Sequence, residues 1–187
     1  MIEAVVIALI FAKIKGYNLK PFFKSWTIYP ILIFELMYIF FQINIFMGNY
    51  EYINCAIWFK EIYMYLFLIP IFRYREYISA LIGSVFIFAG TFLNHLVIAA
   101  NGGQMPVFPS LSYLTGYVKP DTFSKIQDIH MVGDGSVKLK FLSDIIDVGY
   151  SVLSIGDILI RVFVVIIIYV TVKRVNEESE KKTRIFS

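Results

Sequence analysis

Long apolar runs separated by short polar or charged stretches set the pattern of this chain. Five runs lie at residues 1–14, 27–48, 54–72, 77–100 and 154–172, each bounded by charged or turn-forming residues. A helix needs roughly 20 apolar residues to cross the ~30 Å hydrocarbon core of a bilayer. The pattern therefore predicts an all-α integral membrane protein with about five transmembrane helices.

The first run is the shortest, because its apolar residues extend only from Ile2 to Ala12. A secretory signal peptide carries its basic residues before the apolar run. Here the lysines follow it, at positions 13, 15, 20 and 24. We therefore expect residues 1–14 to be a real element, tilted or thinly inserted in the bilayer, and their length leaves open whether they cross it fully.

The one large polar segment is the loop of residues 101–153, which opens with "NGGQMPVFP". Two glycines and two prolines cannot continue the preceding helix, so a sharp turn is expected there. Both ends of the loop join predicted spans at the same membrane face. We expect it to fold back as a cap over a single transmembrane domain of residues 1–175, followed by a charged cytoplasmic tail at 176–187.

A β-hairpin is predicted inside this loop, in the stretch "MVGDGSVKLKFL". Gly133–Ser136 can form a tight turn, and Val137, Leu139 and Phe141 then alternate with two lysines. Alternation after a Gly-Asp-Gly turn is typical of a short antiparallel pair.

Composition supports the membrane class and orients the chain. Hydrophobic residues make up 58% and charged residues 17% of the sequence, too little polar surface for a soluble domain. Lys and Arg concentrate in residues 13–26, 73–76 and 173–187, which the positive-inside rule places in the cytoplasm. The N-terminus and the loop are then outside and the C-terminus inside. The net charge of +3 reflects this asymmetry and the attraction of basic loops for anionic lipid, and no nucleic-acid partner is expected.

Ionisable side chains inside apolar runs are energetically costly and are therefore candidates for function. Lys60 and Glu61 are near the outer interface and can snorkel or pair, whereas Glu35 is deeper and requires a proton or a partner from another helix. His95 either packs between helices through a hydrogen bond or handles a proton or ligand. The full set is Glu35, Lys60, Glu61, His95, Asp157 and Arg161.

No metal or cofactor is expected. His95 has no second His, Cys or carboxylate at metal-ligand spacing, and the other histidine, His130, stands isolated in the loop. The single cysteine, Cys55, excludes an internal disulfide and a cysteine-based metal cluster.

The stretch "SIGD" supports two interpretations. Ser154 and Asp157 form a capping-box pattern before the last apolar run, worth about 1 kcal/mol, and Arg161 can pair with Asp157 at i+4. Alternatively, the folded-back loop brings Asp144 close to Asp157. Two such carboxylates share a proton and can act as acid and base on a water molecule, as in aspartyl peptidases.

The second half of the chain, from Asn94 to Ile168, carries "NGGQMPV", "FLSDII" and "SIGDILI". With these motifs it resembles an uncharacterised bacterial family of small multi-pass membrane proteins, a domain of unknown function. The resemblance implies a shared fold in the bacterial cytoplasmic membrane and no known activity.

A weaker similarity is to lipoprotein signal peptidase, a membrane aspartyl protease. Asn101-Gly102-Gly103, Asp144 and Ser154-Ile155-Gly156-Asp157 are similar to that family's motifs in order and type. The family's Gly-and-Asn-to-Arg helix motif has no counterpart here, and Ser154 stands where the family has Asn.

Two functions from different classes remain open. The first is a non-catalytic subunit or binding module whose loop docks another membrane protein, a lipid, or a lipid-linked or peptide ligand; it predicts Asp157 paired with Arg161 and Asp144 exposed or turned into a local cap. The second is an aspartyl hydrolase at the outer membrane face, with Asp144 and Asp157 facing each other across a cavity. Candidate binding residues flank the loop: Asn94, His95, Asn101, Gly102, Gly103, Gln104, Pro106, Ser154 and Arg161.

Overall fold

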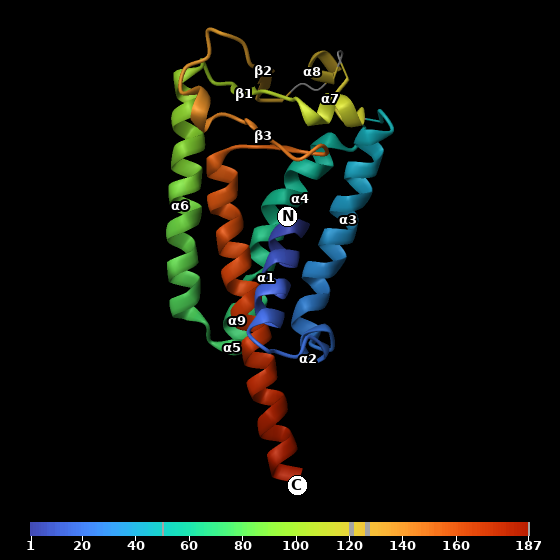
Figure 1. The fold of residues 1–187 in the computed structure, drawn as a ribbon, viewed down its shortest axis with the longest axis vertical. Helices are drawn as coiled ribbons and strands as arrows, with labels where there is room; N and C mark the ends of the chain where they lie inside the picture. Colours follow the sequence, from blue (N-terminus) through green and yellow to red (C-terminus); the bar gives the residue numbers. More distant parts are fainter. Residues whose placement is uncertain (50, 120–121, 126–127, 187) are drawn as a thin grey trace. The chain divides into compact units, whose positions relative to one another are not determined.

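The computed structural model describes residues 1–49, 51–119, 122–125 and 128–186 and is mainly helical (Figure 1). The side chain of Lys60 lies outside the described part. The chain divides into two compact units, which we describe separately. Unit 1 comprises Met1–Met37, Trp58–Phe86 and Arg161–Ser187, and unit 2 comprises Tyr38–Ile57 and Ile87–Ile160.

Helices follow one another along most of the chain. They are α1 (Ile2–Ile14), α2 (Lys20–Phe23), the 3-10 helix η1 (Trp26–Ile28), α3 (Tyr29–Phe46), α4 (Ile53–Leu66), α5 (Leu68–Tyr74), α6 (Tyr77–Ala100), α7 (Leu111–Thr115), α8 (Thr122–Lys125), the 3-10 helix η2 (Lys140–Leu142) and α9 (Ile155–Phe186). Four short strands lie between α6 and α9: β1 (Met105–Val107), β2 (His130–Val132), β3 (Ile146–Asp147) and β4 (Val152–Leu153).

Three helices in the described part of the chain are long and apolar enough to cross a membrane. They cover Trp26–Phe46, Tyr77–Ala100 and Ile155–Lys182. Three of the five predicted runs therefore correspond to span-length helices. The predicted spans at 1–14 and 54–72 are not confirmed, since α1 is about 20 Å long at 1.5 Å per residue and the other run is divided.

Pro70 explains why the run at 54–72 is divided. A proline ring inside a helix clashes with the carbonyl of the residue four positions earlier, here Leu66. The first helix of the run, α4, ends at Leu66, and α5 begins at Leu68. Pro70 lies inside the second of these two shorter helices.

The core of unit 1 combines small residues on α1 with large residues on α5 and α9. Ala4, Ala8 and Ala12 recur every four residues, so they share one face of α1, and all three are buried. Small side chains let neighbouring backbones approach closely. The ring of Phe67 packs edge-on against Phe163 of α9, with ring centroids 5.7 Å apart.

Within unit 2, the end of α6 and the start of α9 meet at two glycines. A Cβ atom on Gly90 would lie 2.4 Å from the carbonyl oxygen of Gly156. A Cβ on Gly156 would lie 2.1 Å from the side-chain oxygen of Asn94. Because real Cβ atoms do not approach other atoms so closely, this contact requires glycine on both helices.

The loop between α6 and α9 is built around β1. This strand pairs in parallel with β2, with Met105 opposite His130, and on its other side Val107 forms a parallel bridge with Asp144. The Phe108 N–H donates to the Asp144 carbonyl at 2.8 Å. Further along, β3 pairs antiparallel with β4, and the Val148 N–H donates to the Ser151 carbonyl at the turn.

The hairpin predicted over residues 131–142 is not confirmed. Its first strand exists as β2, but β2 pairs with β1, and residues 140–142 form η2 instead of a second strand. An antiparallel pair does occur in the loop, as β3 and β4. Among the described residues, the alternating Val137, Leu139 and Phe141 are therefore not part of a sheet.

The glycine contact between α6 and α9 yields a testable prediction. Gly90→Ala should lower the free energy of unfolding by about 1–3 kcal/mol, because the added methyl meets the Gly156 backbone and neither helix can yield cheaply. Gly135→Ala is the matched control, since nothing lies within 4 Å of its Cβ position. Thermal unfolding of both variants in detergent tests this; equal unfolding midpoints would contradict the proposed close contact.

Candidate functional site

A polar junction joins α6 to the start of α9 in unit 2. The Ser154 hydroxyl donates to the side-chain oxygen of Asn94 at 2.8 Å, and the Asn94 amide nitrogen lies 3.4 Å from Oδ1 of Asp157. The Asp157 N–H donates to the Ser154 hydroxyl at 2.9 Å, and the Ser154 N–H donates to Oδ2 of Asp157 at 3.3 Å. The last two bonds are those of the predicted capping box, which is confirmed. Asn94 extends this cap across to the neighbouring helix.

The "NGG" turn ends α6 and fastens the loop behind it. Gly102 and Gly103 have φ angles of +70° and +89°, which L-residues other than glycine rarely adopt, and the Gly103 N–H donates to the Ile98 carbonyl at 2.9 Å. The Asn101 side chain donates to the Lys138 carbonyl and accepts from the Lys138 N–H, both at 2.9 Å. The Asn101 amide is thus hydrogen-bonded to the backbone of the loop.

Asp144 is buried, so of the two positions that the binding-module hypothesis allowed for it, exposed or in a local cap, the exposed one is wrong. Its Oδ2 lies 3.7 Å from Nε2 of His130, whose Nδ1 lies 2.7 Å from Oδ2 of Asp128. His130 was therefore wrongly described as isolated, because parallel pairing of β1 with β2 and with residue 144 brings it between two carboxylates. Burial alone would raise the pKa of Asp128, but the hydrogen bond and charge of His130 hold that pKa below its ordinary value.

Asp144 and Asp157 have different neighbours: Asp144 lies near His130, at 3.7 Å, whereas Asp157 is hydrogen-bonded with Asn94 and Ser154. The aspartyl dyad stays a prediction, and so does the pairing of Asp157 with Arg161.

Asp147 is the most connected side chain of the loop, and sequence reasoning missed it. Its carboxylate accepts from the N–H groups of Ser110 and Ser112 at 2.6 and 2.8 Å, from the Ser112 hydroxyl at 2.5 Å and from the Gly149 N–H at 2.8 Å. It therefore caps the start of α7 from a distant position and also closes its own turn. The Asp-x-Gly spacing of residues 147–149 is a local turn signal that could have indicated the second role.

Burial alone would raise the pKa of Asp147. The Ser112 hydroxyl and the three backbone N–H groups outweigh that effect and hold the pKa below its ordinary value. The folded loop therefore stabilises the charged form of Asp147.

Unit 1 contains the buried charge that the sequence left unexplained. Glu35 is only 4% exposed, and its Oε1 accepts a hydrogen bond from the Tyr63 hydroxyl at 2.5 Å. Arg161 of α9 lies near Glu3 of α1, with Nε 3.9 Å from Oε2. Glu35 thus has a partner from another helix, one of the two solutions expected for it, and carboxylates from α1 and α3 share this interior with Arg161.

The remaining candidate residues of the loop and of α6 are His95, Gln104 and Pro106. His95 and Gln104 are exposed and make no side-chain hydrogen bond to another described residue. Pro106 is buried in β1, where its carbonyl accepts from the Asp144 N–H at 3.1 Å. Across residues 1–49, 51–119, 122–125 and 128–186, no group of three or more His, Cys, Asp or Glu side chains is arranged to hold a metal ion.

Comparison with known proteins places the chain in a family. The model of a family of unknown function, DUF5317, matches residues 19–169, and the chain belongs to this family. No curated protein and no solved structure matches it significantly.

The hydrogen bonds of Asp147 predict a loop that is sensitive to acid. A carboxyl whose pKa is lowered by folding stabilises the fold fully above its unfolded pKa, and the contribution is lost as pH falls through the folded pKa. Asp147→Asn should lower the free energy of loop unfolding by about 1–2 kcal/mol at neutral pH, and this difference should shrink below about pH 4. Thermal unfolding of both proteins between pH 7 and pH 3 measures it. The exposed Asp134→Asn is the control, and a difference independent of pH would contradict the assignment.

Proposed function

We propose that this member of the DUF5317 family is a multi-pass membrane protein that docks a partner protein through the loop between α6 and α9, without catalysing a reaction itself. The observation that carries the proposal is that polar and apolar side chains of the loop have different surroundings. Its well-connected polar side chains bind the loop's own backbone, while large apolar side chains remain exposed.

The polar residues support binding over catalysis. Asn101 is engaged with both backbone groups of Lys138, and Asp147 with three N–H groups and a hydroxyl. Asp157 accepts within its own helix cap. A general acid or base must reach a substrate proton, and side chains fixed in this way hold the fold instead.

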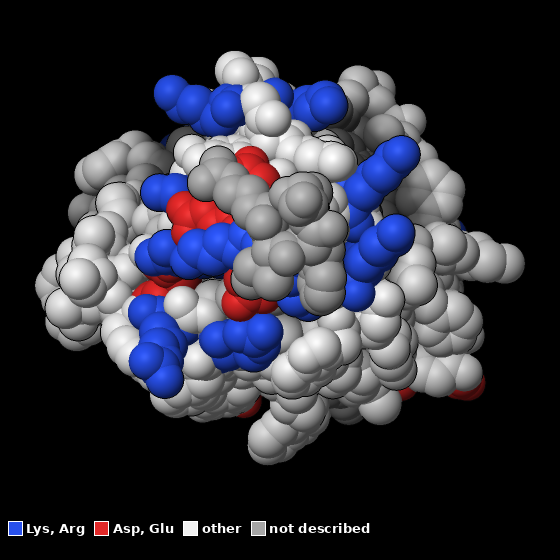
Figure 2. All heavy atoms as spheres, turned by 90° about the horizontal axis from the view of Figure 1, so that it is seen from below, with Lys and Arg blue, Asp and Glu red and all other residues white. Residues whose placement is uncertain are grey.

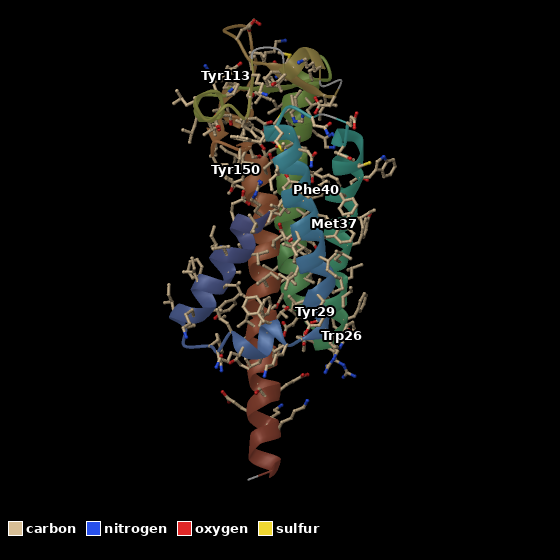
Figure 3. The ribbon with its side chains drawn as sticks, turned by 90° about the vertical axis from the view of Figure 1, so that its right-hand side faces the viewer. Trp26, Tyr29, Met37, Phe40, Tyr113 and Tyr150 are labelled. Atoms are coloured by element: carbon tan, nitrogen blue, oxygen red, sulfur yellow. The ribbon has the colours of Figure 1, made fainter. Side chains whose placement is uncertain are left out.

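Four of the exposed apolar side chains of the loop lie on α7 and on the turn between β3 and β4, and we call them the loop patch: Leu111, Tyr113, Leu114 and Tyr150. The two elements are adjacent, because the Thr115 hydroxyl donates to the Gly149 carbonyl and Leu111 lies beside Gly149. Leu114 is 84% exposed, and Tyr113 and Tyr150, which are labelled in Figure 3, are 43% and 39% exposed. No charged residue occurs between Asn101 and Val118.

A protein partner fits this surface. The centres of protein interfaces are depleted in charge and enriched in tyrosine and other large apolar residues, with polar residues at the rim. The loop patch has this composition, and Lys119, Asp134 and Lys138 lie elsewhere on the same loop. The capping of α7 by Asp147 keeps the patch in one conformation, which reduces the entropy lost on binding.

The proposed topology follows the charges. The three span-length helices cross the bacterial cytoplasmic membrane, and α1 and the α4–α5 pair are inserted beside them. Basic residues of segments 13–26, 73–76 and 173–187 face the cytoplasm together with the C-terminus. The N-terminus and the loop patch are then outside, where the partner is met.

Photo-crosslinking in native membranes tests the docking proposal. Leu114 is replaced by a photoreactive phenylalanine analogue, and we expect a protein adduct of one discrete mass. The same analogue at Asp134, an exposed turn of the loop, is the position control and should give no such adduct. Adding Tyr150→Arg to the Leu114 probe should abolish the adduct, because a charge in the patch opposes burial. Adducts with lipid alone, or a protein adduct that survives Tyr150→Arg, would overturn the proposal.

A further inference from the structure

Four lysines at one end of unit 1 are exposed and carry no internal counter-charge. Lys13, Lys15, Lys20 and Lys24 make no ion pair with any other residue that the structure describes. No Asp or Glu occurs between Glu3 and Glu35 in the sequence, so the local chain cannot neutralise them. We call the segment that carries them, residues 13–26, the basic platform.

Two arginines of unit 1 behave differently. Arg73 donates through two nitrogens to Glu178, and Arg174 pairs with Glu76 and Glu177. Figure 2, the view from below, shows Lys and Arg side chains with Asp and Glu side chains among them. These two arginines have carboxylate partners within the protein, whereas the four lysines of the basic platform have none among the described residues.

The backbone of the basic platform is held in place. The Asn18 N–H donates to the side-chain oxygen of Asn176, whose amide nitrogen donates back to the Asn18 carbonyl, both at 2.9 Å. Phe22 is fully buried, and the Ser25 and Tyr74 hydroxyls are 2.8 Å apart. These anchors fix the segment to α9 and α5, so the lysines do not have to be ordered when an anion binds.

Exposed aromatic side chains accompany the lysines and identify the kind of anion. Phe23 follows Lys20 in α2, Trp26 follows Lys24, and both rings are exposed. Figure 3 labels Trp26 beside the start of α3, a helix of membrane-spanning length. Aromatic rings of this kind settle at the headgroup level of a bilayer, and a free phosphate ion would gain nothing from them.

We infer that the basic platform binds the headgroups of anionic phospholipids. Four lysines supply the charge, and Phe23 and Trp26 fix the depth. Each basic residue near an anionic membrane surface strengthens binding by roughly fivefold. The inference does not depend on the docking role of the loop.

The two tryptophans of the chain provide the test, because either can be left as the single fluorescent reporter. Trp58→Phe leaves Trp26 at the basic platform, and Trp26→Phe leaves Trp58 in α4 as the matched control. The proteins are reconstituted in bilayers that contain brominated phosphatidylglycerol or brominated phosphatidylcholine as quencher. Trp26 should be quenched more strongly by the anionic lipid. The substitutions Lys15→Gln, Lys20→Gln and Lys24→Gln together should reduce this preference, by up to roughly fivefold for each lysine.

Three controls make the result decisive. The substitutions Lys119→Gln, Lys138→Gln and Lys140→Gln together remove the same charge from the loop. They should leave the preference of Trp26 for the anionic quencher unchanged. Inorganic phosphate, matched in ionic strength with chloride, should not compete with the lipid. Circular dichroism checks that each variant is folded. Equal quenching of Trp26 by both lipids, a preference that survives the three substitutions, or competition by phosphate would overturn the inference.

Discussion

Every buried backbone N–H and C=O group needs a hydrogen-bond partner. The rest of the structure depends on how the segment between α6 and α9 provides these partners. In long apolar helices the requirement is satisfied internally. Within its described residues, the loop that follows Ala100 has strands of three and two residues, so backbone pairing alone is insufficient. Side chains supply further hydrogen-bond partners. Asn101 bonds to the backbone of Lys138, and Asp147 accepts from the backbone N–H groups of Ser110, Ser112 and Gly149. A loop stabilised in this way can leave its apolar side chains to a partner.

The same principle joins the two ends of the loop. Gly90 and Gly156 allow α6 and α9 to approach until the Asn94 side chain reaches Ser154 and Asp157. The helix cap and the helix contact therefore depend on each other: a larger residue at either glycine would separate Asn94 from the cap. Residues that suggested a reactive centre in the sequence hold together the base of the loop.

Features set by nearby residues could be predicted from the sequence. The capping box of Ser154 and Asp157 needs only a three-residue spacing, and the end of α6 at Gly102 and Gly103 follows from backbone freedom. Three span-length helices follow from apolar length. The division of the α4–α5 run also has a local cause, because the ring of Pro70 clashes with the Leu66 carbonyl of a continuous helix.

Features set by distant residues could not be predicted. The pairing of Met105 with His130 and of Val107 with Asp144 joins parts of the loop with no local signal, and the alternation after Gly133 favoured the wrong partner. The burial of Asp144, its approach to His130 and the capping of α7 by Asp147 all follow from that pairing. Glu35 was recognised as needing a partner, yet the sequence contained nothing that identified Tyr63.

The central claim is that polar side chains fix the loop between α6 and α9 as an ordered module. Hydrogen exchange of the protein in lipid nanodiscs, followed by mass spectrometry, tests it most directly. The amides of residues 105–112 and 144–153 should exchange far more slowly than an unstructured peptide of the same sequence, because their N–H groups are bonded to β-strand partners and to Asp147. Exchange of these amides at the rate of an unstructured chain would contradict the account.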